Sequence, residues 1–339
     1  MSAAAAVAAT RTRADEDALR RCLAGALGSE ALAAADVRRE RSAFASSYDA
    51  EVITVRLAGG EELTLFLKNF GASGFPKDDP TGRRDRERAV YRDLLADAKL
   101  GTASYYGSVW DERRGRFWLL LEFVRGSELR SCALEYWIMA AAWLGRMHGH
   151  FARLEARLRG CDSLERHDAE FFRLKAECAA REVCRVSAPL AGRFAKAMGR
   201  YERAAAVMAR PPRTLVHGHF RPCNVLVAAD SAPARICPVD WEQAAVGSGL
   251  YDLALLTDGF APPELDRLIE AYRGAALAQG LAVPEREELR QAVDCFRLFI
   301  EVNLLSRARQ RGASEGKVAE TVARVEQRAR ALGALGADA

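Results

Sequence analysis

A group of potentially reactive side chains lies in the stretch HGHFRPCNVLV, between two apolar runs. It supplies the imidazoles of His217 and His219, the guanidinium of Arg221 and the amide of Asn224, and Asp240 follows in the segment VDWE. Amide and carboxylate oxygens are ligands that Mg²⁺ accepts in proteins. Because short strands flank both Asn224 and Asp240, we expect the two side chains to converge on one metal ion. The layout indicates phosphoryl-transfer chemistry.

The letters HGHF occur twice, from His148 and from His217, and the two copies hold four of the five histidines. A paired zinc site is one interpretation, because H-x-H pairs can chelate a metal, but no third type of ligand is well spaced. The first copy ends a helical pattern and the second follows a strand, so the surroundings do not support a repeat. We expect His148, His150 and His217 to be structural, with a metal-binding protein as the weaker alternative.

The first third of the chain is predicted to form mainly a β-sheet, because apolar residues alternate along several short runs. We expect a helix at Asp15–Leu27, a hairpin of Asp49–Leu57 and Leu63–Phe70, a helix at Arg83–Leu95, and strands at Ala103–Trp110 and Phe117–Val124.

The rest of the chain has mainly helical periodicity. We expect helices at Leu134–Phe151 and within Ala169–Ala209, short strands at Thr214–Val216, Asn224–Ala228 and Arg235–Val239, and helices from Asp252 onward, ending with Gly316–Gly333. This order predicts the α+β class, with a small N-terminal β-sheet lobe at residues 1–124 and a large, mostly helical C-terminal lobe at residues 125–339.

These motifs resemble the aminoglycoside phosphotransferase family, with its choline-kinase-like and homoserine-kinase-like relatives. That family reads H-G-D-x-x-x-x-N, then I/V-D-W/F-E, then G-x-x-x-x-D-L-A; here the segments are HGHFRPCN, VDWE, and Gly247 with Asp252-Leu253-Ala254. The resemblance runs from about Ser42 to the last helices. It implies a bilobal protein-kinase-like fold and ATP- and Mg²⁺-dependent transfer to the hydroxyl of a small molecule, such as an aminoglycoside-like antibiotic, a sugar or an amino alcohol.

The resemblance also implies roles for charged residues. Arg221 takes the place of a cation near the transferred phosphoryl group, and Lys68 in LFLKNF matches the lysine that binds the α- and β-phosphates. Glu87 matches the ion-pair partner of that lysine. Asp252 is expected to support the catalytic loop rather than to contact substrate.

Further contacts with the nucleotide are implied on the N-terminal side. Ser46 and Ser47, in the stretch FASSY, precede the hairpin where a phosphate-covering loop belongs. The stretch lacks glycine, so Ser hydroxyls and backbone N–H groups would contact the phosphates. The resemblance implies that the backbone of Glu122 and Val124 binds adenine.

One residue departs from the family pattern, because His219 stands where the family has its catalytic aspartate. An imidazole with a pKa of about 6.5 can act as a base near neutral pH. Phosphates would favour its charged form, and Mg²⁺ and Arg221 would favour its neutral form. His219 is therefore a working base, or the reaction is slower or left to a surrogate such as Glu242, or the protein is a pseudokinase that binds nucleotide with little transfer.

Composition limits the remaining function classes. The net charge of +4 over 339 residues is small and arginines alternate with acids, so we expect no nucleic-acid partner. The eight cysteines are scattered without a C-x-x-C pair, which is typical of reduced thiols. We interpret the N-terminal MSAAAAVAATRTR as a frayed tail rather than a signal peptide, and expect no membrane span, a cytoplasmic location and, from the excess of alanine and arginine, a bacterial origin.

The acceptor pocket is expected in the helical lobe, within Cys161–Arg210 and Ala261–Ala339. These ranges contain no acidic cluster diagnostic of a polycationic aminoglycoside. The sequence therefore predicts a small-molecule hydroxyl acceptor without identifying it.

Overall fold

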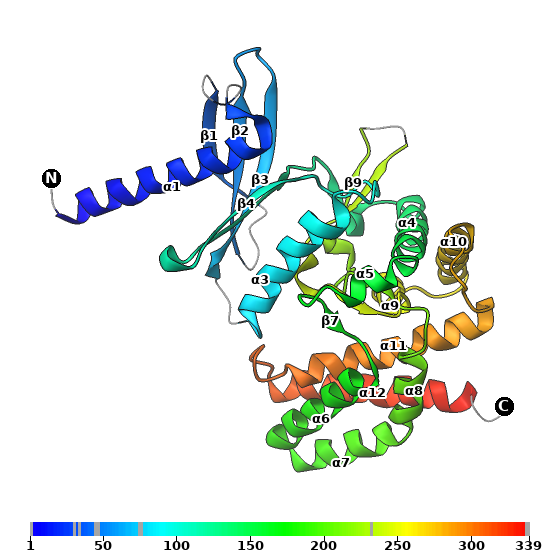
Figure 1. Cartoon of the computed structure of the whole chain (residues 1–339). Helices are drawn as coiled ribbons and strands as arrows, with labels where there is room; N and C mark the ends of the chain where they lie inside the picture. The colour runs from blue at the N-terminus through cyan, green and yellow to red at the C-terminus, as the bar shows by residue number, and fades with distance from the viewer. Residues whose placement is uncertain are drawn as a thin grey trace. The chain divides into compact units, whose positions relative to one another are not determined.

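The chain folds into two compact units, Met1–Arg125 and Gly126–Ala339 (Figure 1). The structure is a computed structural model, and it describes residues 3–29, 32, 35–43, 48–73, 77–230 and 233–335. Ser46 and Ser47, which we expect in a phosphate-covering loop, lie outside the described residues.

The first unit contains an antiparallel sheet with the strand order β1-β2-β3-β5-β4. Its elements are α1 (Ala3–Leu27), β1 (Asp36–Arg41), β2 (Tyr48–Arg56), β3 (Glu62–Ser73), α3 (Pro80–Ala89), a π-helix η1 (Val90–Leu95), β4 (Tyr105–Asp111), a 3₁₀ turn η2 (Glu112–Arg114) and β5 (Arg116–Glu122).

The predicted hairpin is confirmed as β2 and β3, and the two later strands are confirmed as β4 and β5. The prediction of a frayed N-terminal tail is wrong, because α1 begins at Ala3; its alanine-rich start has a high helix propensity. Sequence periodicity missed β1, whose residues DVRRER carry no apolar alternation. This strand forms by pairing along β2, a contact that local pattern does not record.

The core of the first unit lies between α1 and one face of the sheet. Leu19 and Leu23 of α1 are fully buried and belong to one apolar cluster with Leu65 and Leu67 of β3. Successive side chains of a strand point to opposite faces. Lys68 therefore faces away from α1, and its charged end is on the face that does not contain this core.

The second unit is mostly helical. Its elements are β6 (Ser127–Glu128), η3 (Leu129–Ser131), α4 (Leu134–Ala152), α5 (Glu155–Arg159), β7 (Glu165–Arg166), α6 (Ala169–Val186), α7 (Ala188–Ala197), η4 (Met198–Arg200), α8 (Tyr201–Met208), β8 (Thr214–Val216), η5 (Pro222–Asn224), β9 (Val225–Ala228), β10 (Arg235–Pro238), η6 (Trp241–Gln243), β11 (Ala245–Gly247), α9 (Leu250–Leu256), α10 (Glu264–Ala278), α11 (Arg286–Ser306) and α12 (Glu315–Leu335). The short strands form two small sheets, ordered β10-β9-β6 and β7-β11-β8. The predicted α+β class is confirmed.

Close packing of α4 against α10 positions several buried residues of the second unit. A side chain at Gly145 of α4 would collide with the backbone oxygen of Tyr272 in α10, and one at Gly149 would collide with Gln279. Two glycines spaced by four residues lie on one helix face and allow the backbones to approach. In the described part of the chain, no helix is long and apolar enough to span a membrane.

Candidate active site

The predicted metal ligands lie at the paired ends of β9 and β10. The antiparallel register places Pro238 opposite Val225. The ladder continues one step further, where the N–H of Val239 donates to the oxygen of Asn224 at 2.9 Å. Asp240 directly follows Val239, so the hairpin holds the amide and the carboxylate on neighbouring backbone segments.

The amide of Asn224 has a defined orientation. Its Nδ2 donates to the backbone oxygen of His219 at 3.0 Å and lies 3.0 Å from Nδ1 of the same histidine. Its Oδ1 lies 3.6 Å from the Cys223 thiol, a weak donor, and makes no other hydrogen bond within the described residues. The amide oxygen is therefore available to a cation.

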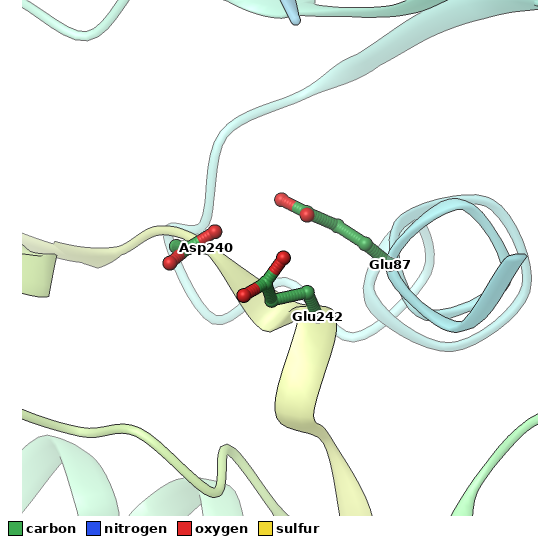
Figure 2. A group of neighbouring side chains, drawn as sticks. All are labelled: Glu87, Asp240 and Glu242. Carbon is green, nitrogen blue, oxygen red and sulfur yellow. The ribbon is translucent and has the colours of Figure 1, made fainter. Parts of the chain in front are cut away.

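Two carboxylates follow the end of β10. Asp240 adopts the left-handed region, with φ 68° and ψ 60°, which aspartate tolerates better than most residues. Glu242 is buried, and one of its oxygens lies within 4.8 Å of one oxygen of Asp240. Figure 2 shows both side chains on the segment that follows β10, and also Glu87, which extends from α3 of the first unit. Carboxylate and amide oxygens fit a hard cation such as Mg²⁺.

The loop between β8 and η5 is anchored by Asp252, a fully buried residue of α9. Its Oδ2 accepts the N–H of His217 at 2.7 Å, and its Oδ1 accepts the N–H of Gly218 at 3.0 Å. Buried backbone donors need such partners, because an unpaired one costs about as much as a lost hydrogen bond. The expectation that Asp252 supports the loop is confirmed.

At Gly218 of this loop, any residue with a side chain would strain the backbone. Its φ of +77° is in the left-handed region, and an added Cβ would collide with the backbone oxygen of Gln243. The loop can therefore pass close to η6 only with glycine at this position.

His217 and His148 are structural, as expected. The Nε2–H of His217 donates to the Val239 oxygen at 3.0 Å, and its Nδ1 accepts the N–H of His219 at 3.2 Å. Burial lowers the pKa of His217, with an opposing effect from the Asp252 carboxylate. His148 is fully buried, with Nδ1 3.1 Å from the Tyr272 hydroxyl and Nε2 3.4 Å from Oδ2 of Asp252.

The alternative of a zinc site made by both HGHF copies has no support in the described residues. Among them, the one group of three or more candidate metal ligands consists of carboxylates and includes no histidine. His148 and His217 instead use their ring nitrogens in hydrogen bonds within the protein. His150, near the end of α4, is half-buried, and its ring is nearly perpendicular to that of Phe151.

His219 presents a neutral ring of defined tautomer. Burial lowers its pKa to about 4; the Asp240 carboxylate opposes this effect, and Arg221 and Arg307 add to it. The Asn224 NH₂ group donates one hydrogen to the His219 backbone oxygen. Because the same nitrogen also lies beside Nδ1 of His219, its second hydrogen is donated to Nδ1. Nδ1 is then an acceptor and Nε2 carries the proton, because a neutral imidazole has one donor and one acceptor.

Lys68 and Glu87 form the ion pair that the family resemblance implies, with Nζ and Oε2 2.6 Å apart within the first unit. Both side chains are buried, and Glu87 is 1% exposed. The Lys68 ammonium also lies 5.1 Å from the centre of the Phe70 ring. A buried carboxylate of this kind is stable only with its cation in place.

Some backbone N–H groups at the end of β5 are already hydrogen-bonded within the protein. The N–H of Glu122 donates to the Ser104 oxygen at 2.9 Å, and the N–H of Phe123 donates to Thr64 at 3.2 Å. The backbone N–H groups of Glu122 and Phe123 are therefore already hydrogen-bonded. Val124 is half-buried, and its N–H makes no hydrogen bond within the described residues.

Sequence reasoning missed Arg307 and Gln243. Arg307 follows α11 as its C-cap, and its Nη1 donates to Oε1 of Gln243 at 3.4 Å. This contact adds a second cation beside the loop that carries Arg221, which is itself half-buried. The two partners are 64 residues apart, so no local pattern signals the contact.

The family assignment follows from the sequence match that covers this loop and its supports. The model of the phosphotransferase enzyme family matches residues 40–291, well over half of the chain. The chain belongs to this family. Its match includes the ion pair of the first unit and the Asn224, Asp240 and Asp252 segments of the second. No curated protein matches the chain significantly.

Solved structures with the same fold include several small-molecule kinases and phosphotransferases. A microcompartment-associated aminopropanol kinase has a TM-score of 0.57 at 16% identity, covering 91% of this chain and 97% of that one. Choline kinase from Cryptosporidium parvum Iowa II has a TM-score of 0.60 at 12% identity, covering 88% and 91%. The GDP complex of aminoglycoside 2'-phosphotransferase-IIIa has a TM-score of 0.59 at 16% identity, covering 87% and 93%. At these identities the likeness establishes the protein-kinase-like fold.

Replacing Asp252 by asparagine should loosen the catalytic loop. The variant keeps one oxygen but places an NH₂ group among backbone donors, so at least one buried N–H loses its partner, at a cost of about 1–3 kcal/mol. We expect a lower unfolding midpoint and faster amide exchange at residues 217–219. Asp162→Asn, an exposed aspartate without a side-chain partner in the described part, is the matched control. Unchanged exchange at residues 217–219 would contradict this role of Asp252.

Proposed function

We propose that this protein is an ATP- and Mg²⁺-dependent phosphotransferase that acts on the hydroxyl group of a small molecule. The observation that carries the proposal is the hairpin contact between Val239 and Asn224 at 2.9 Å, which holds an amide oxygen and the Asp240 carboxylate on adjacent strand ends. Family membership and the kinase fold support the same reaction class.

In this proposal Asn224 and Asp240 hold Mg²⁺. Glu242 places a further carboxylate near the metal. Bound Mg²⁺ supplies positive charge that neutralises phosphate oxygens. Lys68, oriented by Glu87, binds the α- and β-phosphates, and the backbone of Glu122 and Val124 binds adenine. Ser46 and Ser47 would cover the phosphates. Arg221 offsets charge on the transferred phosphoryl group.

His219 contributes a hydrogen-bond donor in this mechanism. With Nδ1 engaged by the Asn224 amide, Nε2–H is the group that the ring offers to an acceptor oxygen. Phosphoryl transfer depends mainly on positioning and on charge stabilisation, since its transition state is loose. A hydrogen-bond donor that orients the hydroxyl of the substrate is therefore compatible with turnover, although a general base would raise the rate more.

The metal site can be tested by replacing Asp240 with asparagine. The change removes one negative charge from the site, so Mg²⁺-dependent ATP binding should weaken by at least about tenfold, about 1.4 kcal/mol. Isothermal calorimetry with Mg²⁺ and with a chelator measures this, and Asp162→Asn serves as the control. Absence of nucleotide binding by the natural protein would refute the proposed function.

The role of Lys68 can be separated from its structural effect by a paired variant. Lys68→Met alone should weaken ATP binding and also lower the unfolding midpoint, because Glu87 stays buried without its cation. The variant Lys68→Met/Glu87→Met should recover the unfolding midpoint while ATP binding stays weak. If the double variant instead binds ATP as tightly as the natural protein, Lys68 does not contact the phosphates.

The role of His219 is tested by comparing transfer rates of the natural protein with His219→Gln, His219→Ala and His219→Asp. If His219 acts as a donor, glutamine should retain much of the activity and alanine should lose most of it. Aspartate restores the carboxylate of the family and should raise the rate, since general-base help is worth about 10²–10⁴-fold.

A substrate screen with hydroxylated antibiotics, sugars and amino alcohols supplies the acceptor for this comparison. Equal rates for alanine and the natural residue would exclude any part for the His219 side chain. Activity in the aspartate variant alone would assign the natural protein to the pseudokinases.

A further inference from the structure

A cavity of about 480 Å³ opens within the second unit. It is lined by α8, the N-terminal half of α11, the end of α12, and residues 281–284 that follow α10. A volume of this size is within the range of small-molecule sites. Most of its lining residues fall within the helical ranges in which we expect the acceptor pocket from the sequence, so its position relative to the catalytic loop decides whether it is that pocket.

The cavity and the catalytic loop lie toward different ends of α11. The last residue of α11 that lines the cavity is Leu298, whereas Arg307 at the end of the helix contacts Gln243 beside the catalytic loop. These residues are nine apart, roughly 13 Å along a helix axis. No residue of 217–224 or 239–243 lines the cavity. The cavity is therefore separate from the catalytic loop itself, although Tyr272, which contacts His148, is part of its lining.

Its walls are mainly apolar. Ala292, Cys295 and Leu298 recur every three residues on one face of α11, and Ala204 and Val207 face them from α8. Val207 is half-buried, so the wall is partly open to solvent. An apolar ligand body would displace water from these surfaces, which is favourable by roughly 25 cal/mol per Å² of buried apolar area.

The charged residues of the lining favour an anion. Two arginines, Arg203 and Arg210, line the cavity with a single carboxylate, Glu288. Within the described residues neither arginine side chain has an ion pair or hydrogen bond, and both are exposed at the opening. Burial raises the pKa of the Cys295 thiol to about 11, and the charge of Arg210 opposes that rise. Arg210 and Cys295 both line the cavity.

We propose that this cavity binds a small amphiphilic carboxylate, with its apolar body between α8 and α11 and its carboxylate on Arg203 and Arg210. Arginine pairs with carboxylates through two parallel hydrogen bonds, and such pairs gain strength where water is partly excluded. The site is independent of the proposed phosphotransfer, because it shares no residue with the catalytic loop or the metal pair.

Fluorescence of anilinonaphthalene sulfonate, an apolar anion, tests the proposal with the full-length protein. We expect saturable binding to one site and displacement by octanoate. Octan-1-ol and octylamine, which have the same chain without the carboxylate, should displace the dye at least about tenfold less well, as expected for loss of a charged hydrogen bond.

Variants locate the site. The double variant R203Q/R210Q should weaken displacement by octanoate at least about tenfold, and V207W should abolish dye binding by filling the cavity. R267Q, which changes an exposed arginine of α10 outside the lining, is the matched control. Thermal unfolding checks that each variant is folded.

Three results would overturn the proposal: no saturable binding, equal displacement by octanoate and octan-1-ol, or a folded R203Q/R210Q protein that behaves like R267Q. ATP binding is measured on the same samples, so loss of the cavity ligand and loss of the nucleotide are distinguished.

Discussion

The conformation of the catalytic loop depends on one fully buried carboxylate, that of Asp252. It accepts the backbone N–H groups of His217 and Gly218, and it also contacts the ring of His148. The loop has no strand partner at these residues, so without this carboxylate two buried donors would be unpaired. His148 in turn contacts Tyr272, and the backbone of α4 therefore has to approach α10 closely, which its glycines allow. Helices α4, α9 and α10 thus support a loop to which they contribute no reacting group.

Asn224 joins this loop to the proposed metal site. Its NH₂ group bonds the backbone and ring of His219, and this leaves its oxygen for a cation. An aspartate at position 219 could accept from the same NH₂ group through one carboxylate oxygen. Nδ1 of the histidine is likewise an acceptor for the Asn224 NH₂ group. Its other ring nitrogen, Nε2, carries an N–H donor, where an aspartate would have its second carboxylate oxygen. In the proposed mechanism, a histidine in place of the aspartate that the resemblance implies would change the group offered to the acceptor while keeping the contact with Asn224.

The solved relatives share the fold at 12–16% identity, which shows how little sequence the architecture requires. In this chain the catalytic loop depends on a few local requirements, which include a glycine where the loop passes η6 and an acid at the base of the loop. Each follows from sterics, hydrogen bonding or charge at one place. The cavity beside α8 and α11 meets none of these requirements of the loop.

The sequence by itself determined the features that depend on short-range order. Alternation specified the hairpin of β2 and β3, and motif spacing identified Asn224, Asp240 and Asp252, because strand ends and tight turns are encoded within a few residues. The pairing of Lys68 with Glu87 was a prediction from resemblance that the packing of α3 against the sheet completed. Tertiary structure alone decided the bond of His148 to Asp252, 104 residues away, the approach of Arg307 to Gln243, the pairing of β1 and the cavity along α11. An amphipathic helix shows which of its faces is buried but not which partner covers it, so contacts between distant helices emerge only when the whole chain packs.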